Sequence, residues 1–190
     1  MFADKPTLTG RLVTLRPVGL DDAEGLYELM SDPEVRRFTG SHLEPDLEGA
    51  RTWYAGRAAH DDRLDLAIVA DGEYVGEVVL NELDADNLSC SLRIALIGAR
   101  AFGKGYGSEA ITLVLDHAFG ATPLHRVSLE VFSYNARARH VYEKLGFVQE
   151  GLLRESLRWA GEWHDTLVMA LLRKEWAAAR GWPARSETLA

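Results

Sequence analysis

Several features that define whole classes of protein are scarce in this sequence. There is one cysteine, Cys90, among 190 residues, which excludes an internal disulfide framework and indicates a reducing, cytoplasmic compartment. No apolar run approaches the roughly 18 residues that a membrane-spanning helix requires, and the first residues lack the pattern of a signal peptide. We therefore expect a cytoplasmic protein with no membrane partner.

Basic residues are also in the minority. Lysine and arginine number 21 against 29 acidic residues, which gives a formal net charge of −8 at pH 7. Nucleic-acid binding relies on basic patches, so no nucleic-acid partner is expected. The acidity suits a cationic partner such as a protonated amine or a basic protein tail, although solubility alone also favours it. The six histidines show no metal-ligand spacing, so no metal is expected.

Glycine is concentrated in one short segment. The run from Phe102 to Ser108 has glycine at every second position, namely Gly103, Gly105 and Gly107. A strand pattern precedes this run, and a helical pattern follows it. Free N–H groups at a helix start, beside glycines that let an anion approach the backbone, form a phosphate cradle. The run is also consistent with a tight turn that binds no ligand.

Two common phosphate-binding motifs can be compared with this run. A Walker loop ends its glycine segment with Gly-Lys-Ser/Thr, whereas Lys104 lies inside the run. The dinucleotide fingerprint fits better, since Gly103, Gly105 and Ser108 take its three positions. Glu130 even lies about twenty residues downstream, where that fold places a ribose-binding acid.

The region before the glycine run argues against a dinucleotide fold. Strand-like segments cover residues 65–70, 73–83 and 88–97, and hairpin-turn sequences at 71–72 and 84–87 separate them. Such short turns join antiparallel strands, whereas the dinucleotide fingerprint belongs to a parallel βαβ unit. The sequence therefore predicts an antiparallel meander that leads into the glycine run.

The rest of the chain shows further strand and helix patterns without a linker or an internal repeat. We expect strands over 7–18, 148–159 and 163–172, helices over 21–30, 33–38 and 46–60, and a short helix at the start of the tail. A chain of this length buries one good core. We therefore predict a single domain over residues 1–190, with its core over about 7–176 and a C-terminal tail over 177–190.

A second informative segment follows the strand predicted over 126–132. Asn135 is a good helix N-cap, and the helix after it carries Tyr142 on its apolar face. Gly146 is placed to end this helix in a left-handed conformation, and Phe147 to make the accompanying hydrophobic contact.

Together these segments resemble the GNAT superfamily of acetyl-CoA-dependent N-acetyltransferases, and most closely its group of ribosomal-protein N-terminal (alanine/serine) acetyltransferases. The family's glycine motif, Q/R-x-x-G-x-G/A, corresponds here to the run that starts at Phe102. Its later helix carries Asn and, seven residues on, Tyr, which are Asn135 and Tyr142 here. The ending Leu145-Gly146-Phe147 is also similar, and the resemblance extends from Thr7 to about Trp176.

The sequence departs from the family pattern at two places. Phe102 stands at the polar Q/R position. A register shifted by two residues would put Arg100 there, but the helix would then start too late. Many relatives also carry an acidic residue in the strand before the loop, whereas residues 89–93 contain none. A catalytic base therefore has to come from elsewhere.

The resemblance implies the fold and the CoA site. The fold is α/β (α+β), with a mixed twisted sheet, helices on both faces, and central parallel strands, 88–97 and 126–132, that splay apart. The gap admits the pantetheine arm of acetyl-CoA, and no metal takes part. The implied CoA-binding residues are Ala95, Leu96, Ile97, Phe102, Gly103, Lys104, Gly105, Tyr106, Gly107, Ser108 and Asn135.

Acetyl transfer needs a base for the amine, whose pKa is about 10, and a proton for the leaving thiolate. Glu130 is the first candidate for the base because its spacing from Asn135 is similar to that of a catalytic glutamate in the family. It is equally consistent with a strand glutamate paired with arginine. Glu77 and Glu82 are alternatives that would act through water. Tyr142 is the candidate acid, although tyrosines on apolar helix faces are more often core residues.

The sequence thus predicts an acetyl-CoA-dependent N-acetyltransferase whose acceptor is a protein N-terminus or a small-molecule amine. The alternative is a non-catalytic acyl-CoA-binding sensor of the same fold, which Phe102 and the missing acid would suit. By analogy with the family, the acceptor cleft is expected between residues 36–42, 53–54 and 159–164. The hairpin turn at 160–162 suits either the acceptor or a homodimer.

Overall fold

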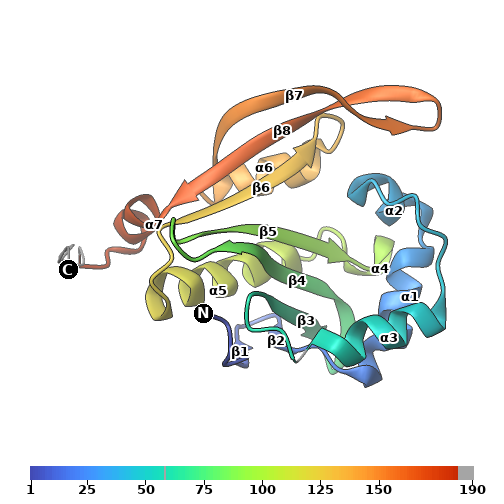
Figure 1. Ribbon diagram of the computed structural model, residues 1–190, viewed down its shortest axis with the longest axis horizontal. Helices are drawn as coiled ribbons and strands as arrows, with labels where there is room; N and C mark the ends of the chain where they lie inside the picture. Colours follow the sequence, from blue (N-terminus) through green and yellow to red (C-terminus); the bar gives the residue numbers. More distant parts are fainter. Residues whose placement is uncertain (58, 184–190) are drawn as a thin grey trace.

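The computed structural model describes residues 1–57 and 59–183 (Figure 1). The strands are β1 (Leu8–Thr9), β2 (Thr14–Pro17), β3 (Leu64–Ala70), β4 (Glu73–Asp84), β5 (Ser89–Leu96), β6 (Arg126–Phe132), β7 (Val148–Trp159) and β8 (Glu162–Leu172). The helices are the 3-10 helix η1 (Leu20–Asp22), α1 (Ala23–Ser31), α2 (Pro33–Thr39), α3 (Leu47–Arg57), α4 (Gly98–Ala101), α5 (Tyr106–Ala121), α6 (Ala136–Lys144) and α7 (Arg173–Arg180).

Within the described residues the eight strands form one mixed sheet, in the order β1-β2-β3-β4-β5-β6-β8-β7. Neighbouring strands are antiparallel except β5 and β6, which are parallel. Figure 1 shows these two strands starting close together beside α7 and separating toward α4. This arrangement confirms the predicted fold class, including the antiparallel meander before the glycine run.

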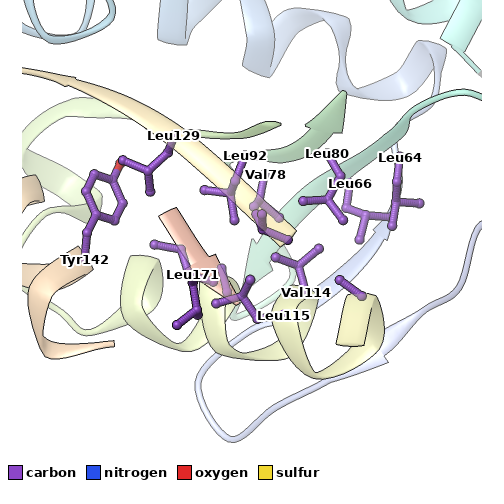
Figure 2. Close-up of a cluster of buried hydrophobic side chains, with 14 of the residues drawn as sticks. Leu64, Leu66, Val78, Leu80, Leu92, Val114, Leu115, Leu129, Tyr142 and Leu171 are labelled. Carbon is purple, nitrogen blue, oxygen red and sulfur yellow. The ribbon is translucent and has the colours of Figure 1, made fainter. Parts of the chain in front are cut away.

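Helices cover both faces of the sheet, as predicted. On one face, Val114 and Leu115 of α5 pack with Leu80 and Leu92 of the central strands in the main core (Figure 2). On the other face, residues of α1 and α3 form a smaller cluster around Ala67 of β3. The sheet is therefore buried on both sides near β3 and β4, as expected for its nearly continuous apolar segments.

The structure differs from the sequence prediction at the N-terminal strand. Residues 7–18 form two short strands, β1 and β2, because the chain turns between them. Glu109 in the first turn of α5 stabilises this turn, since its carboxylate accepts the backbone N–H groups of Arg11, Leu12 and Val13 over 3.0, 2.6 and 2.8 Å. An acceptor so distant in the sequence leaves no local pattern.

Three smaller differences concern the helices. α3 ends at Arg57, before the predicted boundary at residue 60, and residue 58 lies outside the described residues. The short helix α4 was not predicted, and it connects β5 to the glycine run. The predicted tail begins as part of helix α7, and its last residues, 184–190, are outside the described residues.

Candidate active site

The separation of β5 and β6 opens a cleft in the sheet. Their parallel ladder contains only the pairs Ser89–Arg126, Cys90–Val127 and Ser91–Ser128. Beyond these pairs lies a cleft of about 620 Å³ between β4, β5, β6, α6 and the glycine run. This volume is within the usual range for small-molecule sites. The predicted splay is therefore present, and it forms the largest part of the candidate site.

On β5, two of the three residues predicted to bind pantetheine line the cleft. Ala95 and Leu96 are both at its wall. Ile97 is buried away from it, and its N–H donates to the carbonyl oxygen of Val75 over 2.9 Å. The structure thus brings Ala95 and Leu96 to the site but gives the N–H of Ile97 a different partner.

The glycine run forms the end of the cleft where α5 begins. Gly103 and Gly105 have φ values of +75° and +84°, and Gly105 is the N-cap of α5. Glycine is needed for such left-handed conformations, and the positive end of the helix dipole favours an anion there. The cleft-lining members of the run are Phe102, Gly103, Gly105, Tyr106, Gly107 and Ser108.

Two members of the run play a different part from the one predicted. Lys104 is exposed and does not line the cleft. The N–H of Phe102 donates to the carbonyl oxygen of Gly98 over 3.2 Å and is therefore not free for a phosphate. Phe102 lines the cleft with its side chain instead.

Helix α6 contributes Asn135 and Tyr142. Asn135 caps the helix as predicted, since its Oδ1 accepts the N–H of Ala138 over 3.1 Å. Its side-chain amide nitrogen donates to none of the described residues and is free for a ligand in the cleft. The N-cap role and a ligand-binding role are therefore compatible, because they use different atoms.

Tyr142 lies at the edge of the main core and also lines the cleft. Its side chain is 8% exposed, and Figure 2 shows its hydroxyl directed toward Leu129. The hydroxyl makes no hydrogen bond with another described residue. Burial raises the pKa of Tyr142 to about 12, so the phenol keeps its proton at neutral pH. The residue is both a core tyrosine and a cleft tyrosine.

Three carboxylates line the cleft: Glu77, Glu82 and Glu130. Glu82 and Glu130 are exposed and make no ion pair or hydrogen bond through their carboxylates within the described part of the chain. The arginine pairing that was the structural alternative for Glu130 is thus not formed. Glu77 differs because it is only partly exposed and the protein binds its carboxylate directly.

Tyr54 holds Glu77, and Tyr74 in turn contacts Tyr54. Tyr54 of α3 donates a hydrogen bond over 2.6 Å to its Oε2, and the hydroxyl groups of Tyr54 and Tyr74 lie 2.9 Å apart. Burial raises the pKa of Glu77, and the Tyr54 hydrogen bond and the positive charge of Arg93 oppose this only in part. The tyrosine pair carried no signal in the sequence, because Tyr54 lies on α3 whereas Tyr74 and Glu77 lie on β4, about twenty residues further along the chain.

Of the segments predicted to form the acceptor walls, only part of 36–42 lines the cleft, and residues 159–164 do not. Phe38 and Thr39 of α2 line the cleft, as does Phe132 at the end of β6. Tyr54 is 1% exposed and does not line it, while Trp53 points to solvent with the Arg57 guanidinium 3.7 Å from its ring centroid. The aromatic pair at 53–54 is therefore not brought to the cleft.

Arg137 in the first turn of α6 is a cleft residue that the sequence did not reveal. Its guanidinium lies 3.8 Å from the ring centroid of Phe102 and 5.1 Å from that of Phe38. Arg137 also makes an ion pair with Glu34 over 3.8 Å. Arg137 thus places a positive charge beside the glycine run.

A sheet opened at one parallel pair, with a glycine-rich helix start at the end of the gap and a tyrosine and carboxylates along it, is the arrangement expected of an acyl-CoA-binding enzyme. Comparison with known proteins agrees with this class. The Acetyltransferase (GNAT) domain family matches residues 12–148. The chain therefore belongs to the GNAT acetyltransferase family, whose members use acetyl-CoA, and it is an acetyltransferase.

Relatives with names and structures support this. The chain is 30% identical over 177 residues to the Probable N-acetyltransferase YjcK of Bacillus subtilis, covering 88% of this chain and 98% of the relative. It is 27% identical over 172 residues to YdaF of the same species, whose name assigns it provisionally to ribosomal N-acetylation, covering 86% and 93%. The structure of spermidine N-acetyltransferase from Vibrio cholerae with CoA and spermine matches with TM-score 0.80 and 25% identity, covering 87% and 98%.

Two further observations concern other kinds of site. None of the helices in residues 1–57 and 59–183 has the length and hydrophobicity that a bilayer crossing demands. The same part of the chain holds no group of three or more His, Cys, Asp or Glu side chains arranged to bind a metal ion.

Proposed function

We propose that the chain acts as a single acetyltransferase domain that transfers the acetyl group of acetyl-CoA directly to a primary amine. The observation that carries the proposal is the cleft, where the glycine run, Asn135, Tyr142 and three carboxylates meet. Direct transfer needs these groups around one thioester carbon. A non-catalytic sensor would need the cradle but not Tyr142 and the carboxylates, so the cleft favours catalysis.

Acetyl-CoA fits the cleft from the glycine run inward. The pyrophosphate would lie on the backbone N–H groups at the start of α5, and the charge of Arg137 supports an anion at that end. The pantetheine arm would lie along Ala95 and Leu96, with the free amide nitrogen of Asn135 as a donor. The thioester would then lie near Tyr142 and the carboxylates.

In the proposed mechanism a cleft carboxylate accepts a proton from the amine, and Tyr142 assists the leaving sulfur. Glu130 is the candidate base from the sequence, and Glu77 and Glu82 share the cleft with it. The pKa of about 12 of Tyr142 lies above that of a thiol, which is about 8.5. Tyr142 would therefore donate a hydrogen bond to the developing thiolate, and solvent would complete the proton transfer.

A cationic acceptor is proposed from the charges in the cleft. Three carboxylates line it against two arginines, Arg93 and Arg137, and Arg137 lies at the glycine run, where CoA is proposed to bind. The net charge of −8 also favours the approach of a cation. One relative is named a spermidine N-acetyltransferase and another a ribosomal N-acetyltransferase. A polyamine and a protein N-terminus are therefore the two acceptor classes to test.

We also propose a cytoplasmic location, where the free Cys90 stays reduced. A further proposal is a homodimer that forms through β7. β7 is the last strand of the sheet, and nine of its twelve residues are exposed. Its apolar side chains Val148, Leu152 and Leu153 are 56%, 48% and 44% exposed. β7 also carries exposed charged residues, and its three exposed apolar side chains lie on an edge strand whose outer side offers unpaired backbone groups to another chain.

Calorimetry with acetyl-CoA tests the central proposal. Arg137→Gln is expected to weaken CoA binding about tenfold, because a charge-assisted contact is lost. Arg139→Gln is the matched control, since Arg139 lies on the same helix and pairs with Glu143 over 2.7 Å outside the cleft. No binding at millimolar acetyl-CoA, or no thiol release with polyamines and N-terminal peptides, would contradict the proposal.

A further inference from the structure

Glu77 is the cleft carboxylate whose position the protein fixes. Tyr74 and Tyr54 form a hydrogen-bonded pair, and Tyr54 donates to Oε2 of Glu77 over 2.6 Å. This leaves Oε1 of Glu77 without a partner among the described residues, and the side chain lines the cleft. One oxygen is thus held and the other is free for a substrate, which is the arrangement that a proton acceptor requires.

The register of the sheet places Glu77 beside Ala95, where the pantetheine arm is proposed to lie. Glu77 is paired with Ala95 across the β4–β5 ladder, so the two side chains lie on the same face. The neighbouring residue, Gly76, has φ +155°, and a Cβ there would lie 2.2 Å from the carbonyl oxygen of Ala95. Only glycine permits this close approach of β4 to β5, which keeps Glu77 next to Ala95.

We propose that Glu77, positioned by Tyr54 and Tyr74, accepts the proton of the acceptor amine, in place of the more exposed Glu130. This inference rests on the proposed acetyl transfer. Glu130 and Glu82 also line the cleft, but neither carboxylate is held by any described residue. A carboxylate that must meet an ammonium group in one geometry benefits from being held, since its position is then set before the substrate binds.

The charges that face Glu77 come from four elements. Tyr54 contacts it from α3 and Tyr74 lies behind Tyr54 on β4, while Arg93 of β5 and Asp65 of β3, with its bidentate partner Arg63, act at longer range. Burial is the largest effect and raises the pKa of Glu77, as does the negative charge of Asp65, while Tyr54 and the two arginines lower it. The raised pKa brings the carboxylate closer to the range in which a base works at neutral pH.

The chemical step is a proton transfer followed by acyl transfer. The ammonium group of the acceptor gives a proton to Glu77, which becomes a carboxylic acid, and the neutral amine attacks the thioester carbon. A C–N bond forms and the C–S bond breaks, and the electron pair of that bond leaves with the CoA sulfur. The new amide nitrogen loses its second proton to solvent, the thiolate gains one, and Glu77 returns its proton to solvent. One proton is released overall.

The substrate-free enzyme gives the first test. In ¹³C NMR of enzyme labelled at glutamate side chains, the signal absent from Glu77→Gln should titrate above the ordinary glutamate pKa of about 4.3. Tyr54→Phe should raise that midpoint further, because it removes the hydrogen bond that favours the charged form. A midpoint at or below the ordinary value would overturn the inference.

Kinetics give the second test, with one amine used for all variants so that its own ionisation is common to them. Glu77→Gln should lower kcat/KM by about 10²-fold or more and should remove the low-pH limb from the pH profile of kcat/KM. Tyr54→Phe should keep this limb but move it to higher pH. Glu73→Gln on the same strand, exposed and outside the cleft, is the control for a charge change. Glu130→Gln should leave the low-pH limb in place.

The outcomes separate the inference from the proposed function. If acetyl-CoA does not bind to the wild-type protein, the proposed function fails. If it binds and is consumed while Glu77→Gln keeps the wild-type limb, or if Glu130→Gln alone removes it, then only the role of Glu77 is wrong. The free energy of unfolding in urea distinguishes a catalytic role of Glu77 from a structural one, because loss of a structural residue would lower it. Because its raised folded pKa means that ionised Glu77 disfavours folding, Glu77→Gln should not destabilise the fold at neutral pH.

Discussion

Ser91 of β5 and Ser128 of β6 are the last pair of the parallel ladder. Beyond them each strand keeps its outer neighbour, since β5 stays paired with β4 up to Leu96 and β6 with β8 up to Phe132. Both walls of the cleft are therefore supported from behind, and their inner edges leave backbone groups for a ligand to bind.

The phosphate cradle can be tested at Gly107. This glycine lines the cleft without a left-handed φ, and an added Cβ would lie 3.4 Å from Cδ1 of Leu96. Gly107→Ala should therefore keep the fold and weaken CoA binding, measured by calorimetry, because the methyl group would narrow the cleft beside Leu96, where CoA is proposed to lie. Gly56→Ala, with nothing within 4 Å of its Cβ, is the matched control and should bind CoA like the wild type. Gly105→Val is less informative, because φ +84° would add backbone strain.

Tyr142→Phe tests the leaving-group role. The ring contacts with Phe147 and the core would remain, so CoA affinity should change little, while kcat should fall by roughly 10²-fold. In the wild type, kcat should not fall through ionisation of Tyr142 below about pH 11, because its pKa is about 12. An unchanged kcat in Tyr142→Phe would mean that the residue is only a core tyrosine.

Glu109 should make stability depend on pH. Partial burial raises its pKa, but the three backbone N–H groups at residues 11–13 outweigh this and lower it below the ordinary value. The stabilisation is therefore present above the unfolded-state pKa, about 4.3, and is lost as pH falls through the lower folded pKa. In urea titrations Glu109→Gln should be less stable than the wild type at pH 7, and the difference should shrink at pH 3. Equal differences at both values would contradict this account.

The proposed dimer is tested by replacing Leu152 and Leu153 together with glutamate. Both are about half exposed, so the monomer should still fold, while like charges on the edge strand should prevent pairing. Light scattering after gel filtration should show dimer mass for the wild type and monomer mass for the variant. Leu20→Glu, 57% exposed in η1, is the control for an added surface charge and should remain dimeric. A monomeric wild type would exclude the dimer.

The sequence by itself determined the local parts of the fold and site. The glycine run opens α5, Asn135 caps α6 and Gly146 ends it with φ +96°, all as predicted. Caps and left-handed turns depend on a few consecutive residues, so their signals stay local. The alternation of strands and hairpin turns likewise predicted the antiparallel meander.

Only the tertiary structure decided which side chains meet. Glu77 and Tyr54 are joined through the packing of α3 on the sheet, and Arg137 reaches Phe102 because α6 lies beside the glycine run. The sequence placed Glu130 first among the carboxylates, but a spacing along the chain does not say which of them will be held by a partner. Hydrogen bonds and burial between distant elements are set by the packed fold, and these decide the pKa and position of a catalytic group.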